Sequence, residues 1–139
     1  MKLVVDASVA IKWAVEENQH AAARALVTGG DELVAPDFIV FEVANILWKK
    51  ARRGEISRQQ AMVALPGIRS VFSRLVPAVV LADSALALAA ELGHPVYDCL
   101  YLAAAQSESA RIVTADRRFL KAVAGSAYTG LVTLLDEVS

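Results

Sequence analysis

The stretch that decides the fold is Leu3-Val4-Val5-Asp6-Ala7-Ser8, a short apolar run that stops at an acidic residue. An apolar run of β-branched residues without alternation is typical of a strand that is buried on both faces. The same pattern recurs near the other end of the chain, in Ile112-Val113-Thr114, and Asp116 follows two residues later. The sequence therefore predicts two buried strands, each followed closely by a carboxylate.

Working outward from these strands, helical segments alternate with weaker strand patterns. The further strands are expected within 33–35, 74–80 and 131–134, and the helices at 7–16, 18–27, 37–53, 57–63 or beyond, 83–92, 96–109 and 116–123. We expect Asp37 to cap the long helix and the next helix to break near Pro66-Gly67. Parallel strands need crossover connections of this length. The sequence thus predicts an α/β fold, a three-layer α/β/α sandwich with a mainly parallel central sheet.

Composition limits the class of protein. The 139 residues suit one domain, 1–139, and a hydrophobic share of 56% with 21% charged residues excludes intrinsic disorder. The longest apolar run, 75–82, is far short of the roughly 20 residues that cross a bilayer. The first apolar run stops at Asp6, before a signal peptide could form. We therefore expect a soluble, cytoplasmic protein with no membrane contact and enough apolar surface for a protein partner.

Four acidic residues are the candidates for chemistry. Asp6 and Asp116 follow strands at the edge of the sheet where ligands bind, although each also fits a helix N-cap. Glu42 lies between Phe38 and Ile46 on one face of its helix, where a carboxylate needs an ion-pair partner such as Lys49, or a metal.

The fourth acid, Asp98, interrupts a helix that is apolar nearly all round. The helix dipole stabilises an acidic side chain in the first turn, so Asp98 also has a purely structural explanation. If the four carboxylates converge, their mutual repulsion calls for a multivalent cation, and an all-oxygen set suits Mg²⁺ or Mn²⁺. Without these four, the chain has eleven acidic residues and fourteen basic ones. An acidic pocket in a mildly basic protein suits a polyanionic substrate that binds to the acids through a metal ion. One cysteine and two histidines exclude a four-ligand zinc site.

Four segments in this order and spacing resemble the PIN-domain ribonucleases, and in particular the VapC-type toxins of type II toxin–antitoxin pairs. The resemblance covers essentially the whole chain. Its segments are Leu3 to Val9, Pro36-Asp37 with Glu42 to Asn45, Tyr97 to Ala103, and Thr114 to Phe119.

The resemblance implies a metal-dependent endoribonuclease, in which water attacks a phosphodiester and leaves a 5′-phosphate and a 3′-hydroxyl. Asp6 and Asp98 would be the main Mg²⁺ (or Mn²⁺) ligands, and Asp116 would complete the metal shell directly or through water. Glu42 would bind a second metal or position the attacking water. Ser8 and Thr114 would support the acids by hydrogen bonds, or else cap helices.

The resemblance also implies partners: an RNA substrate, a second copy in a homodimer and a small antitoxin that covers the site. Arg117 and Arg118, with Lys121, follow Asp116 and would meet RNA phosphates, or else remain solvated. Of the two tryptophans, we expect Trp13 at an interface and Trp48 in the core.

The strand-end acids suggest three alternatives, two of which lack residues that they need. A strand-end aspartate is also found in phosphotransferases of the haloacid-dehalogenase type, but those have a second aspartate where this chain has Ser8. Phosphoacceptor receiver domains have an adjacent acidic pair near the amino terminus, which this sequence lacks. The third alternative is a non-catalytic α/β oligomeric binding module in which the acids only cap helices and pair with arginines.

Overall fold

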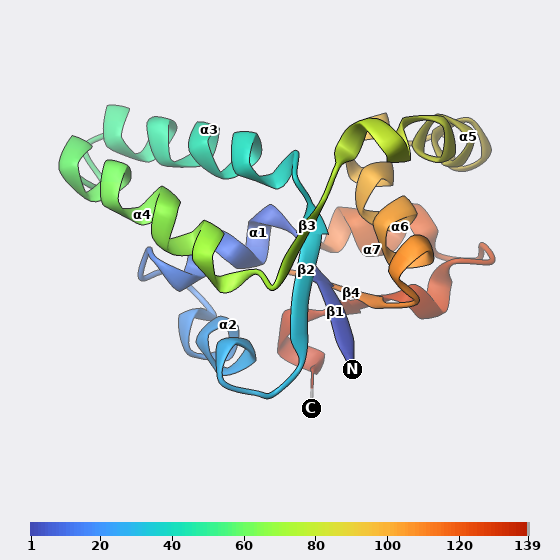
Figure 1. Ribbon diagram of the computed structural model, residues 1–139, viewed down its shortest axis with the longest axis horizontal. Coiled ribbons are helices and arrows are strands. Elements are labelled where there is room, and N and C mark those ends of the chain that lie inside the picture. The colour runs from blue at the N-terminus through green and yellow to red at the C-terminus, as the bar shows by residue number, and fades with distance from the viewer. Residues whose placement is uncertain (139) are drawn as a thin grey trace.

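A computed structural model describes residues 1–138 and contains one five-stranded sheet in the order β3-β2-β1-β4-β5 (Figure 1). All four strand pairings in this sheet are parallel. Each strand expected from the sequence is present, so the predicted parallel sheet is confirmed. The strands are β1 (Lys2–Val5), β2 (Glu32–Pro36), β3 (Arg74–Val76), β4 (Arg111–Thr114) and β5 (Val132–Leu134).

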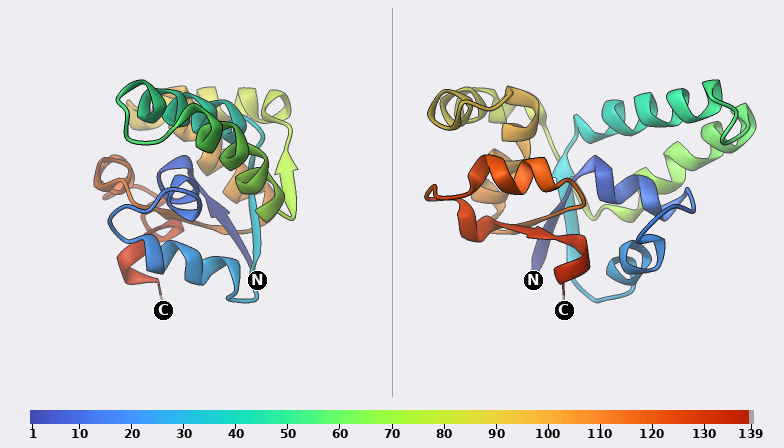
Figure 2. Two further views of the ribbon diagram at one scale, coloured as in Figure 1. Left: turned by 90° about the vertical axis from the view of Figure 1, so that its left-hand side faces the viewer. Right: turned by 180° about the vertical axis from the view of Figure 1, so that it is seen from behind.

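Helices cover both faces of the sheet, which confirms the three-layer architecture. Helices α1 to α4 pack on one face and α5 to α7 on the other (Figures 1 and 2). The helices are α1 (Ala7–Ala10), α2 (His20–Val27), α3 (Ile39–Arg52), α4 (Arg58–Val71), α5 (Ala82–Leu92), α6 (Val96–Glu108) and α7 (Arg117–Val123). Short 3₁₀ turns complete the described chain: η1 (Ile11–Trp13), η2 (Ala78–Leu81), η3 (Thr129–Leu131) and η4 (Leu135–Glu137).

Helix boundaries differ from the expected ones in three places. The first helix tightens into η1 after only four residues. Asp37 does not cap α3, because its carboxylate accepts a hydrogen bond from the backbone N–H of Ala78 at 2.8 Å and so ties the ends of β2 and β3 together. Helix α4 runs through Pro66 to Val71, since Pro66 lies on the exposed face, where water can satisfy the carbonyl group left without a partner.

The order of the strands fixes where a ligand would bind. The chain leaves β1 towards β2 and leaves β4 towards β5, on opposite sides of the β1–β4 pair. Such a switch point opens a crevice at the carboxyl ends of the two strands. In Figure 1 β1 runs upward from the N-terminus, and the first turns of α3 and α6 approach each other above its carboxyl end. The fold therefore brings the residues that follow β1 and β4 together with the beginnings of α3 and α6.

Within residues 1–138, no single helix is long and apolar enough to cross a membrane. Residues 78–92 and α6 meet the length and composition criteria only as a pair, and a bend of 115° separates them.

Candidate active site

Asp6 lies at the centre of the switch point and is 6% exposed. Ser8 donates a hydrogen bond to its Oδ1 at 2.6 Å, and Thr114, at the end of β4, donates to its Oδ2. Asp6 also caps α1, because Oδ1 accepts from the backbone N–H of Val9. Burial raises the pKa of Asp6 to about 6, with a further contribution from the charge of Asp98, although these hydrogen bonds oppose the rise. Capping alone does not require a carboxylate this deeply buried.

Glu42 reaches the same edge from the first turn of α3. The inner stripe of that helix consists of Ile39, Val43 and Leu47, and Glu42 lies beside it, half-buried. Its partner is the buried hydroxyl of Tyr101 on α6, which donates to Oε1, rather than the Lys49 ammonium. Burial raises the pKa of Glu42 to about 7, and the nearby charges of Asp6 and Asp98 add to the rise.

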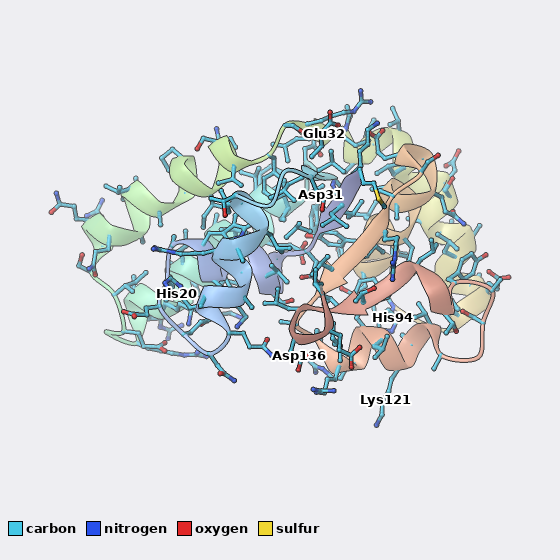
Figure 3. All side chains as sticks on the ribbon, turned by 90° about the horizontal axis from the view of Figure 1, so that it is seen from below. His20, Asp31, Glu32, His94, Lys121 and Asp136 are labelled. Carbon is cyan, nitrogen blue, oxygen red and sulfur yellow. The ribbon has the colours of Figure 1, made fainter. Side chains whose placement is uncertain are left out.

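Asp98 is in the first turn of α6 and is held by a histidine. His94 Nε2 lies 2.6 Å from Asp98 Oδ2. Gly93 ends α5 with a φ of +64°, which favours glycine, and so turns the chain toward His94. The imidazole ring lies 6.2 Å from the Phe119 ring of α7, and Lys121 of that helix points into solvent (Figure 3). Packing and one hydrogen bond therefore orient Asp98.

Asp116 lies on the rim of this group. Its carboxylate caps α7 by accepting from the backbone N–H of Arg118 at 2.9 Å, and its own N–H donates to Thr114 Oγ1 at 3.0 Å. Thr114 thus connects Asp116 with Asp6. The two arginines that follow are largely exposed: Arg117 pairs with Asp136 at 3.3 Å, and Arg118 lies 3.4 Å from Asp116.

Asp6 and Glu42 are the acids of this group that no basic side chain of the described residues compensates. The charge of Asp98 raises the pKa of Asp6, and the charges of Asp6 and Asp98 together raise the pKa of Glu42. Within the described residues, neither Asp6 nor Glu42 forms a salt bridge. No three His, Cys, Asp or Glu side chains of residues 1–138 lie close enough to enclose an ion by themselves. A divalent ion at this edge would therefore rest on one or two of these carboxylates and on water.

Two neighbours of the acids were not anticipated from the sequence. Tyr101 was recognisable only as a hydroxyl within a buried helix, where it needs a partner. His94 precedes Asp98 by four residues, a spacing that brings side chains together within a helix. Because Gly93 and Pro95 place His94 outside a helix, the sequence did not predict this contact. Both contacts arise from tertiary packing.

The expectation for the tryptophans is wrong. Trp13 is only 7% exposed: the tight η1 turn directs it inward, its Nε1 donates to the Ala23 carbonyl at 2.9 Å, and its ring packs on Phe72. Trp48 is 54% exposed because it follows Leu47 and lies about 100° around α3 from the inner stripe. The Arg52 guanidinium lies 5.3 Å from the centre of its ring.

A five-stranded parallel sheet with carboxylates at its switch point defines an α/β protein with an acidic site. The chain belongs to the PIN domain family, whose sequence profile matches residues 3–125. It is similar to Ribonuclease VapC3 of Pyrobaculum aerophilum, with 42% identity over 122 residues that cover 85% of this chain and 92% of that protein. Exonuclease VapC9 of the same organism is 29% identical over 126 residues, 91% of this chain and 89% of that protein.

Solved structures share the fold. The crystal structure of PAE2754 from Pyrobaculum aerophilum matches with a TM-score of 0.72 and 27% identity, covering 98% of this chain and 85% of that one. The structure of VapBC2 from Rickettsia felis, bound to a DNA fragment from its promoter, matches with a TM-score of 0.67. At 11% identity over 96% of this chain and 98% of that one, this second likeness shows the fold alone. The family resemblance seen in the sequence is confirmed.

Proposed function

We propose that this protein is a metal-dependent endoribonuclease and the toxin of a toxin–antitoxin pair. The observation that carries the proposal is the group of Asp6, Glu42 and Asp98 at the switch point: buried Asp6 and half-buried Glu42 form no salt bridge within the described residues, and the charge of Asp98 raises the pKa of both. The 42% identity to a protein named a ribonuclease supports the choice of RNA.

The donor set fits Mg²⁺ or Mn²⁺ because it consists of carboxylate oxygens. Asp6 and Asp98 would be the main ligands, with Asp116 in the shell directly or through water. A bound divalent ion would orient water, lower its pKa and stabilise the leaving oxygen.

The chain's own residues would then divide the remaining work. Ser8 and Thr114 hold both oxygens of Asp6, and His94 holds one oxygen of Asp98, so neither carboxylate has to reorganise when substrate binds. Glu42, whose pKa is about 7, would accept a proton from the attacking water near neutral pH. Arg117 and Arg118 would meet the phosphates on either side.

The partners belong to the same proposal. The Rickettsia felis structure is of VapBC2, and by analogy we expect an antitoxin for this chain. A homodimer and a cytoplasmic location are what the family resemblance implies. Exposed apolar side chains on α3 and α4, among them Trp48, Met62 and Val63, support a protein partner.

The decisive experiment is an RNase assay on total cellular RNA with Mg²⁺, Mn²⁺ or EDTA. Wild type is compared with Asp98→Asn and with Asp83→Asn, an exposed first-turn acid of α5 that provides a matched control. We expect metal-dependent cleavage by wild type and Asp83→Asn, and a loss of at least about 100-fold in Asp98→Asn. Product ends mapped inside transcripts would support endonucleolytic cleavage, and only stepwise shortening would assign an exonuclease.

Equal activity of wild type and Asp98→Asn would refute the acidic site. Absence of cleavage by all three proteins with either metal would favour the binding module instead.

A further inference from the structure

Three aromatic rings form a row at the beginnings of α3 and α6, the helices that supply Glu42 and Asp98. The rings of Phe38 and Tyr97 are stacked, with centroids 5.1 Å apart and planes only 9° from parallel. Phe41 continues the row, with its centroid 6.2 Å from that of Phe38 and its plane tilted by 48°. We call Phe38, Phe41 and Tyr97 the aromatic shelf.

The shelf is rigid on its inner side and open on its outer side. Phe38 is half-buried and packs against the core, so it fixes the ring that lies on it. Phe41 is 69% exposed and Tyr97 is 61% exposed. Aromatic rings have a large apolar area, and two neighbouring rings left in water gain from a ligand that covers them.

The position of the shelf points to its ligand. Phe41 directly precedes Glu42, and Tyr97 directly precedes Asp98. The stack of Phe38 on Tyr97 joins the beginnings of α3 and α6, the two helices that supply these acids. In a nucleotide a single ribose separates the phosphate from the base. A phosphodiester held at the acids would therefore bring an adjacent base to the shelf.

We infer that the aromatic shelf stacks one unpaired nucleobase of the RNA beside the scissile phosphate. The inference rests on the proposed nuclease function for the placement of that phosphate. A base would extend the Phe38–Tyr97 stack, since every base presents a flat π face to a parallel ring. Stacking also discriminates: a base inside a duplex is paired and covered, so the shelf selects single-stranded RNA.

The test measures RNA binding in the Asp6→Asn background with Mg²⁺, so that the RNA stays intact. The probe is a short fluorescein-labelled RNA of mixed sequence, used single-stranded and as a duplex, and Kd is measured by fluorescence anisotropy. Tyr97→Ala and Phe41→Ala remove exposed rings, Tyr97→Phe keeps the ring, and Leu86→Ala removes an exposed apolar side chain on α5 as the control. Thermal melting checks that each variant is folded.

We expect Tyr97→Ala to weaken single-strand binding about 5- to 150-fold, and Phe41→Ala to weaken it in the same direction. Tyr97→Phe and Leu86→Ala should change Kd less than about twofold, because the stacking surface is kept, and duplex binding should not respond to any of them.

The stacking inference is overturned if the parent binds no single-stranded RNA, if Tyr97→Ala leaves Kd unchanged, or if single-strand and duplex binding weaken equally. A change in sedimentation coefficient without a change in Kd would also overturn it and assign the shelf to a protein interface. Cleavage by the wild type separates the two proposals. If binding depends on the shelf but wild type cleaves no RNA, only the nuclease proposal fails.

Discussion

The carboxylate of Asp6 is buried at a cost to stability. Its pKa rises from an ordinary 3.8 to about 6, so between these values the folded chain binds a proton more readily than the unfolded chain. Stability therefore falls as the pH rises through this window and stays low above it. The loss of stability above this window is the cost of keeping Asp6 ionised in a buried place, where no cationic side chain of the described residues pairs with it.

Asp6→Asn should consequently stabilise the metal-free protein. In EDTA at pH 7.5 we expect the free energy of unfolding to increase by about 1–3 kcal/mol, and at pH 4 the gain should nearly vanish. Urea unfolding at both pH values measures this, with the exposed Asp83→Asn as the control. An unchanged or lower stability at pH 7.5 would contradict the assigned burial cost.

His94 should act through Asp98. His94→Ala removes the hydrogen bond to Oδ2, so the carboxylate loses its fixed orientation and the Mn²⁺ concentration for half-maximal cleavage should rise about 10- to 100-fold. His94→Gln keeps an N–H donor in reach and should recover most of the affinity. His20→Ala is the control, since that imidazole contacts the Lys12 carbonyl away from the acids. Equal metal dependence in all three variants would leave His94 with a packing role only.

Among the elements, α4 shows packing overriding local preference. Its amino terminus carries a full capping box between Ser57 and Gln60, and its buried Ile68 lies beyond Pro66. Burial of Ile68 therefore stabilises the helix beyond Pro66, although the proline removes one backbone hydrogen bond.

Pro66→Ala should restore that hydrogen bond and stabilise the protein by about 1–3 kcal/mol. Thermal unfolding of Pro66→Ala and of Arg69→Ala, an exposed substitution in the last turn, measures the difference. A lower melting temperature for Pro66→Ala would mean that the proline ring itself contributes packing that we have not assigned.

Local patterns predicted the elements but not their contacts. The β-branched runs before Asp6 and Asp116 were enough to predict β1 and β4, and the crossover lengths implied a parallel sheet. Tyr101 and Glu42 are 59 residues apart, and no periodicity connects them. The inward turn of Trp13 depends on η1 tightening against α2, which again no local pattern encodes. Sequence reasoning therefore pointed to the four acids and to Ser8 and Thr114, but not to Tyr101 and His94, which contact Glu42 and Asp98.

Taken as a whole, the molecule should respond to divalent ions as a stabilising ligand. Binding to the folded state alone raises the free energy of unfolding by about 2.7 kcal/mol at 100 times Kd. We expect the melting temperature of wild type and Asp83→Asn to rise with Mn²⁺, and that of the double variant Asp6→Asn, Asp98→Asn to stay constant. The same rise in the double variant would place the bound ion elsewhere.

The central position of β1 has a consequence for biosynthesis. Strand β1 leaves the ribosome before both of its neighbours, so one edge can pair with β2 early, but its other edge waits for β4, and Asp6 waits for a hydroxyl 108 residues further along the chain. A nascent chain that has released α3 and α6 still lacks Thr114, Asp116 and one side of the switch point. The acidic edge is therefore assembled only after translation has passed β4, so an incomplete chain carries most of the acids without the geometry that joins them.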